Sequence, residues 1–387
     1  MGWWTDFDPV EVGADFERIA AAGFDSVRLF LTWEDFQPAP NTVDTGMLDR
    51  LVAVADLAER DGLAIMPTLF TGHMSGVNWI PEWALGGSDG DDRFRVVSGG
   101  RPVESGLRNW YTDPEVGAAQ ALLAGAAAGA LAGHGAVWAW DLGNENSNCV
   151  QPPSRIEGRD WLQRTTAAIR SADPGVLITT GLHMEDLEED RMLGPAEAGE
   201  VCDFLTMHGY PIYAGWAAGP TDEHLLPFLA HMTRWLGGGS DVLFSEFGLP
   251  TYRRADPGAE QAQNETSSML VEEQTAAAYT KRALGTLRGA GCTGAMLWCY
   301  TDYAPAIWTR PPLDVATHER SFGLWRADGS PKPSVEVVGD FSGLDRVGGS
   351  DGFDWIDIEA DEFWADSAAH LARLYGRYRE SGGFTSR

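Results

Sequence analysis

The feature that most constrains the fold is an alternation of short apolar runs with helical stretches along most of the chain. Each run is rich in branched and aromatic residues, as are strands buried on both faces of a parallel sheet. Strands that alternate with helices are joined by right-handed crossovers, so we expect an α/β fold, a (β/α)8 TIM barrel. Seven runs are predicted as its strands: 24–33, 63–70, 137–145, 176–183, 204–210, 242–247 and 294–300.

The predicted barrel is one strand short at its N-terminus. A helix with Asp8 as its cap, Pro9 at its first position and Glu11 in its first turn opens the chain, and no strand-like run precedes it. We interpret this as a first strand lost because the true start lies upstream of Met1. An open, doubly wound sheet and a strand supplied by residues 353–358 are the alternatives.

The chain is predicted to form one barrel with a short extension. Residues 1–340 are expected to be the catalytic barrel, with a long irregular connection at 71–112 acting as a binding loop or lid. Residues 341–387 are expected to add a glycine-rich linker at 343–352. An amphipathic helix at 361–379 would then pack on the barrel.

Charge excludes one class of partner. The formal net charge of −29 argues against nucleic-acid binding, which needs clustered Lys and Arg. The acidity fits either a halophile surface or codon bias with ordinary acidity. There is no membrane-length apolar run and no recognisable signal peptide, so a cytoplasmic protein without a membrane partner is expected. The four cysteines lack metal-ligand spacing, so no metal and no cofactor are expected.

Two predicted strands each end in a glutamate. The run at 137–145 ends in Asn144 and Glu145, and the run at 242–247 carries Glu246. In a barrel of parallel strands the carboxyl ends lie on one face, where catalytic groups gather. We therefore expect Glu145 and Glu246 to form a pair of facing carboxylates.

Other residues follow in a recognisable order. Arg28 lies on the first visible strand, His208 and Tyr210 end the strand before Glu246, and Trp298 lies on the last strand. Together with the Asn-Glu step, this order resembles the retaining glycoside hydrolases of family five, a clan A group of TIM barrels, and especially their β-mannanase and β-mannosidase branch. The resemblance spans residues 8–333.

The resemblance implies hydrolysis of β-linked glycosidic bonds by double displacement. Glu246 would be the nucleophile and Glu145 the acid/base. Arg28 and Tyr210 would hold Glu246 as an anion, whose proximity raises the proton affinity of Glu145. The implied substrate is β-1,4-mannan or a related oligosaccharide, with glucan left open. Three more residues would serve the substrate or its surroundings: Asn144 at the sugar 2-hydroxyl, His208 beside the acid/base, and Trp298 as the floor of the subsite.

One tryptophan is a candidate for contact with the substrate. Trp33, directly after a strand, is predicted to stack on a sugar ring.

Two rival functions remain open. A metal-dependent hydrolase could use His183, His208 and Asp302, although the sequence lacks the His-x-His pair such barrels need. A non-catalytic carbohydrate-binding barrel is the second rival. The sequence does not indicate an oligomeric state.

Overall fold

The computed structural model describes residues 2–90, 93–254, 269–347 and 352–382. The chain forms two compact units. Unit 1 comprises Met1–Leu182 and Arg191–Phe204, and unit 2 comprises His183–Asp190 and Leu205–Arg387. Among the helices of these described ranges, none has the length and apolar character needed to cross a bilayer.

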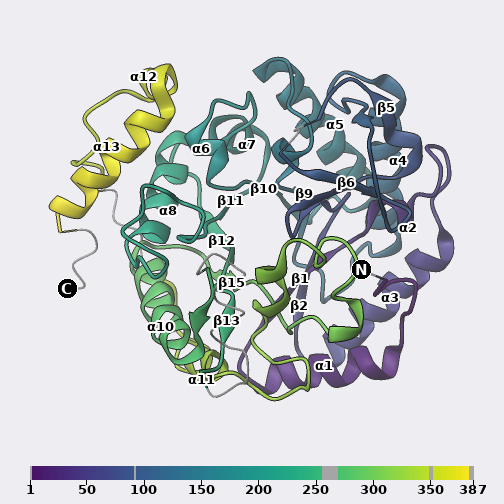
Figure 1. The fold of residues 1–387 in the computed structure, drawn as a ribbon. Helices are drawn as coiled ribbons and strands as arrows, with labels where there is room; N and C mark the ends of the chain where they lie inside the picture. The colour runs from purple at the N-terminus through teal and green to yellow at the C-terminus, as the bar shows by residue number, and fades with distance from the viewer. Residues whose placement is uncertain (1, 91–92, 255–268, 348–351, 383–387) are drawn as a thin grey trace. The chain divides into compact units, whose positions relative to one another are not determined.

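Unit 1 is built on four parallel strands that match the first four predicted runs. β1 (Ser26–Phe30) pairs with β2 (Ala64–Thr68), β2 with β9 (Ala139–Asn144), and β9 with β10 (Leu177–Gly181). The helices of this unit include α4 and α5, which lie side by side (Figure 1). Its longer helices are α1 (Pro9–Ala21), α3 (Thr45–Arg60), α4 (Pro114–Ala130) and α5 (Arg155–Ala172).

The predicted helix start at Asp8 is confirmed. The Asp8 side chain accepts a hydrogen bond from the Val10 amide, and Pro9 is at the first position of α1. Proline suits this position because its missing N–H would have no partner inside the helix. The helix then buries Val12 and Phe16 on one face. The capping residue therefore sets where the amphipathic face begins.

The connection between β2 and α4 was expected to be irregular, and this expectation is wrong. It contains short strands that extend the sheet in the order β9-β3-β4-β6-β7. The strands are two to four residues long, too short for an alternating pattern to stand out in the sequence. They are β3 (Gly72–Met74), β4 (Val77–Trp79), β6 (Arg95–Ser98) and β7 (Arg101–Val103), with β5 (Leu85–Gly87) and β8 (Gly106–Leu107) forming a separate antiparallel pair.

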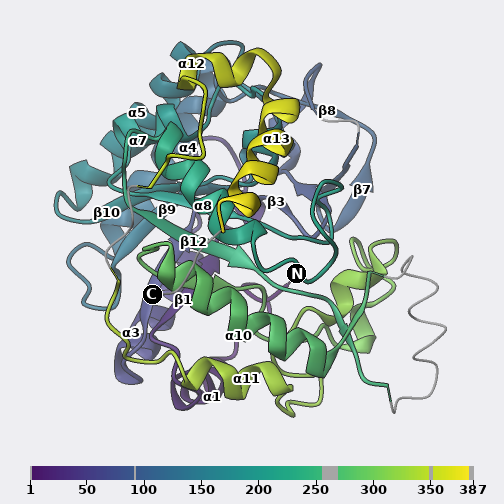
Figure 2. The same cartoon turned by 90° about the vertical axis from the view of Figure 1, so that its left-hand side faces the viewer.

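Unit 2 is built on three parallel strands that match the last three predicted runs. Their order is β11 (Leu205–His208), β12 (Val242–Phe247) and β15 (Ala295–Leu297). α10 and α11 lie side by side in both views (Figures 1 and 2). The helices of this unit include α8 (Leu225–Leu236), α10 (Glu273–Gly289) and α11 (Pro333–Gly339).

All seven predicted runs thus contain a strand. Within the described residues no strand precedes α1, as the sequence predicts. Residues 353–358 contain no strand either, so the alternative in which the tail supplies one is wrong. The alternating pattern there instead falls in a turn-rich segment before α12 (Ala360–Phe363).

The predicted C-terminal helix is α13 (Ser367–Glu380). It packs on other elements of unit 2, where the Tyr375 hydroxyl donates to Asp222 Oδ2 at 2.5 Å. Ser367 Oγ donates to the Glu188 carbonyl at 2.7 Å, close to α6 (Glu185–Glu188). The predicted linker at 343–352 lies partly outside the described residues, which omit 348–351.

Candidate active site

One cluster of candidate residues in unit 1 joins the middle of β1 to β9 and its carboxyl end. Arg28 donates to Asp141 Oδ2 from Nε at 3.0 Å and from a terminal nitrogen at 2.6 Å. The same terminal nitrogen donates to Asn144 Oδ1 at 2.7 Å. Asp141 is fully buried and also accepts from Thr68 Oγ1 at 2.9 Å. The guanidinium therefore fixes the side chain of Asn144 at the strand end.

The sequence left two possible ion-pair partners for Arg28, either Glu246 or a structural acid. The structure gives it Asp141, an acid inside β9. A buried guanidinium needs such a partner, because an unpaired charge there is costly. Asp141 was missed as a site residue, although an aspartate inside an apolar strand was the signal for it.

Glu145 follows β9 in an unusual backbone conformation. Its φ of 49° lies in the left-handed region, which residues other than glycine rarely adopt. The conformation is held in part by its amide, which donates to the Gly181 carbonyl on β10 at 3.0 Å. Its carboxylate oxygen Oε2 accepts from Asn148 Nδ2 at 3.4 Å. Non-glycine residues in this region are enriched at functional sites, because only the surrounding structure can maintain them.

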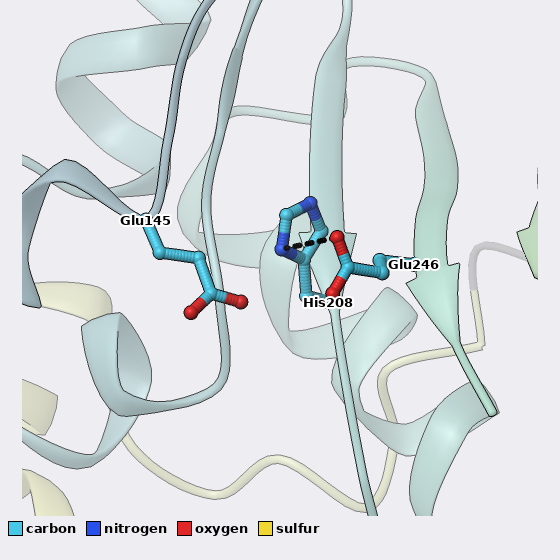
Figure 3. A group of neighbouring side chains, drawn as sticks. All are labelled: Glu145, His208 and Glu246. Carbon is cyan, nitrogen blue, oxygen red and sulfur yellow. Dashed lines mark ion pairs between the residues drawn. The ribbon is translucent and has the colours of Figure 1, made fainter. Parts of the chain in front are cut away.

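A second cluster lies at the carboxyl ends of β11 and β12 in unit 2. Glu246 is 8% exposed, and the Tyr210 hydroxyl donates to its Oε1 at 2.5 Å. His208 Nδ1 lies 3.8 Å from Glu246 Oε2 (Figure 3). The strand register explains this, since His208 is the partner of Glu246 between the two strands. His208 thus lies beside the expected nucleophile.

Trp298 directly follows β15 in the same unit. Its amide donates to the Phe247 carbonyl at 2.8 Å, which links it to the end of β12. The chain passes so close that a Cβ at Gly248 would lie 2.2 Å from the Trp298 carbonyl oxygen. Only glycine fits there, so the residue that follows Phe247 helps to position Trp298.

The prediction that Trp33 stacks on a sugar is wrong. The side chain is 1% exposed, and its Nε1 donates to Gln37 Oε1 at 2.8 Å. Its indole packs against Phe70, Trp83 and Trp110. A sugar cannot reach a ring with so little exposed surface. Trp33 is a core residue of unit 1, and its position after a strand did not reveal this.

The alternative set of metal ligands is weakened by Asp302. Its Oδ1 accepts from Lys332 Nζ at 2.7 Å and from the Gly323 amide at 2.9 Å. Burial raises the pKa of Asp302 and lowers that of Lys332, while their attraction opposes both shifts. Asp302 is therefore engaged in a structural ion pair. His183 Nε2 lies 3.6 Å from Asp186 Oδ1. The backbone of His183 also forms an isolated parallel β-bridge with that of His208.

No model of a protein family matches the chain, but it resembles several known proteins in sequence and structure. Mannan endo-1,4-β-mannosidase A of Emericella nidulans is 24% identical over 273 residues, 64% of this chain and 65% of the relative. The chain spans less than two thirds of the length of the curated relatives it matches.

Solved structures give a broader match. A variant of the GH5_18 protein from Bifidobacterium longum, in complex with Manβ1-4GlcNAc, has a TM-score of 0.78 at 18% identity. The match covers 98% of this chain and 86% of that one. The exo-β-1,4-mannosidase Op5Man5 from an Opitutaceae bacterium has a TM-score of 0.68 at 28% identity, covering 88% and 57%.

These findings confirm the predicted resemblance to the clan A glycoside hydrolases of the family-five type, with their (β/α)8 barrel fold. Within that class, two of the relatives have names that belong to the same branch. The curated relative and Op5Man5 are both named for action on β-mannosidic bonds, as the predicted mannanase-like branch implies.

Proposed function

We propose that the protein is a retaining β-glycoside hydrolase that acts on β-1,4-linked mannosides. The names of the relatives support the mannoside, since they include an endo-acting mannanase and an exo-acting mannosidase. A disaccharide with a β1-4 mannosyl bond is bound in the related Bifidobacterium structure, which supports an oligosaccharide substrate.

The observation that carries the proposal is the environment of Glu246. It is a nearly buried glutamate at the carboxyl end of a parallel strand, and a tyrosine hydroxyl donates to it at 2.5 Å. The donated hydrogen bond fixes the orientation of the carboxyl group by holding Oε1. The carboxylate is then positioned as a nucleophile, and Oε2 is the oxygen to which Tyr210 does not donate.

The proposed partner of Glu246 is Glu145, which ends another parallel strand. In a (β/α)8 barrel the carboxyl ends of all strands open on the same face, which supports a shared cleft. Retention requires the two carboxyl groups to be about 5–5.5 Å apart, whereas inversion requires about 6.5–9.5 Å.

The reaction then proceeds in two displacements. A carboxylate oxygen of Glu246 bonds to the anomeric carbon while the glycosidic C–O bond breaks, and Glu145 gives its proton to the departing oxygen. Glu145, now ionised, takes a proton from water as the water oxygen attacks the anomeric carbon. The bond to Glu246 breaks, and the sugar leaves with its original anomeric configuration.

Asn144 is proposed to bind the sugar 2-hydroxyl. Its Oδ1 is occupied by Arg28, which has only donors, so its Nδ2 is the end that donates. In the structure Nδ2 contacts the His73 carbonyl. A hydrogen bond to the 2-hydroxyl strengthens in the transition state. Trp298 is proposed as the subsite floor.

The proposal is tested with aryl β-mannosides and β-1,4-mannooligosaccharides, following the anomer of the first product by NMR. We expect β-mannose to appear first. Glu246→Gln should reduce turnover by about 10³-fold or more, since it removes the nucleophile. Glu223→Gln is the control, because Glu223 pairs with Arg282 on an exposed surface. An α-product, or a fully active Glu246→Gln variant, would overturn the proposal.

A further inference from the structure

We propose that Arg191 is a positioning residue for the acid/base, because it fixes the amide of Asn148 and thereby selects the oxygen of Glu145 that carries the proton. The inference rests on the proposed role of Glu145. All three residues belong to unit 1.

The Arg191 guanidinium is buried directly behind the segment that follows Glu145. The residue is 2% exposed, and one terminal nitrogen donates to Asn148 Oδ1 at 2.8 Å. The same nitrogen donates to Ser147 Oγ at 3.1 Å. Ser147 and Asn148 form part of the short helix η2 (Asn146–Asn148), which starts at the residue after Glu145. Arg191 therefore holds this short helix from a place more than forty residues along the chain.

The backbone of Asn148 is held as firmly as its side chain. Its amide donates to the Glu145 carbonyl at 3.0 Å, and its own carbonyl accepts from Asn78 Nδ2 at 2.8 Å. Asn78 in turn contacts His73 Nδ1 at 2.8 Å. Asn148 is only 2% exposed. The remaining freedom of the residue is a rotation that would exchange its amide oxygen and nitrogen.

Arg191 removes that freedom. A guanidinium has five donors and no acceptor, so the atom of Asn148 that faces it must be the oxygen. The nitrogen of the amide then faces Glu145, where Nδ2 lies 3.4 Å from Oε2. The orientation of this asparagine thus follows from the chemistry of its neighbour. Without Arg191, either end of the amide could face the glutamate.

The orientation has a consequence for the proton. Because Nδ2 donates to Oε2, that oxygen is an acceptor, and a proton on it would oppose the N–H. The acid proton is therefore held on Oε1. Oε1 delivers the proton to the departing oxygen in the first displacement and takes one from water in the second. If the amide reversed, its oxygen would accept a hydrogen bond from a protonated Oε2, which would hold the acid proton on the wrong oxygen.

The inference is tested with Arg191→Met and a series of aryl β-mannosides whose phenols differ in acidity. A strongly acidic phenol such as 2,4-dinitrophenol leaves without a proton, whereas a weakly acidic phenol needs the acid. We expect kcat/KM to fall by about 10²-fold for poor leaving groups, which is the usual scale of general acid catalysis. For the dinitrophenyl substrate, kcat/KM should change by no more than about threefold, because this phenol leaves without a proton and does not need the acid.

A second variant guards against misfolding of Arg191→Met. Asn148→Asp keeps a partner for Arg191 but replaces the donor that faces Glu145 with an acceptor. It should give the same selective loss for poor leaving groups. Arg155→Met is the matched control, since Arg155 is an arginine of the same unit that pairs with Glu197 at 3.0 Å. It should leave the dependence on the phenol unchanged.

The outcomes separate this inference from the proposed function. An equal change for all leaving groups in both variants, or no change in either, would overturn the positioning role. Glu145→Gln tests the proposed function itself. If Glu145→Gln hydrolyses the poor substrates as fast as the parent enzyme, the assignment of Glu145 fails. If it does not, and Arg191→Met and Asn148→Asp lack the selective loss, only the role of Arg191 fails.

Discussion

Tyr210 donates a hydrogen bond to Glu246 Oε1 at 2.5 Å, and its hydroxyl can be removed without changing the shape of the ring. A hydrogen bond to a charged group contributes about 1.5–3 kcal/mol. Tyr210→Phe should therefore reduce kcat/KM by about 10- to 100-fold, as measured with an aryl β-mannoside. Tyr213→Phe is the control, because the Tyr213 hydroxyl contacts His318 and Glu319 instead. Equal losses in the two variants would show that the hydroxyl of Tyr210 has no special role.

Single residues also mark how far the sequence could predict the site. Glu246 and Tyr210 follow from their positions at strand ends, and the structure brings them together. Asp141 had a signal, as an aspartate inside an apolar strand, but the sequence did not identify Arg28 as its partner. The importance of Arg191 could not be predicted, since its partner Asn148 is distant in the chain. Trp33 shows the opposite failure, because its position after a strand says nothing about the side chains that cover it.

At the scale of elements, the Lys332 side chain connects three segments of unit 2, one that precedes β15 and two that follow it. Its Nζ donates to Asp302 Oδ1 at 2.7 Å, to Thr251 Oγ1 at 2.8 Å and to the Ser321 carbonyl at 2.9 Å. The ammonium is almost fully buried, so its removal leaves an uncompensated acid.

Lys332→Met should therefore lower the free energy of unfolding by about 3–5 kcal/mol in urea denaturation. The other lysine of the chain provides the control. Lys281 forms an exposed pair with Asp340, so Lys281→Met should cost no more than about 1 kcal/mol. Adding Asp302→Asn to Lys332→Met should recover part of the loss. Similar values for the two lysine variants would contradict a structural role for the buried pair.

Element length decides what the sequence reveals at this scale. The seven barrel strands were found because each is a sustained apolar run, and in unit 1 these runs alternate with capped helices such as α1 and α4. The short strands between β2 and α4 were missed. They pair through their backbones at the edge of the sheet, and too few side chains take part to create a period.

At the scale of the whole molecule, one buried histidine links folding stability to pH. Burial, together with the nearby Arg234, lowers the pKa of His231 to about 4. Between about pH 6.5 and 4 the unfolded chain binds a proton there that the folded protein does not, so stability falls as the pH is lowered. The loss should reach on the order of 3 kcal/mol near pH 4.

His231→Phe removes this titration and keeps an aromatic ring beside Tyr378. Melting temperatures measured from pH 7 to pH 4.5 should fall less steeply for this variant than for the parent protein. His134→Phe is the control, since its side chain pairs with an exposed acid. Parallel curves for the parent protein and His231→Phe would show that His231 is not the group responsible.

The central claim is that Glu246 forms a covalent bond with the sugar. A 2-deoxy-2-fluoro-β-mannosyl fluoride slows both displacements but has an excellent leaving group, so the glycosyl-enzyme should accumulate. Peptide mass spectrometry should then find one added fluoro-sugar on the peptide that contains Glu246, and none in Glu246→Gln. A label on another residue, or steady hydrolysis with an inverted product and no label, would contradict the account.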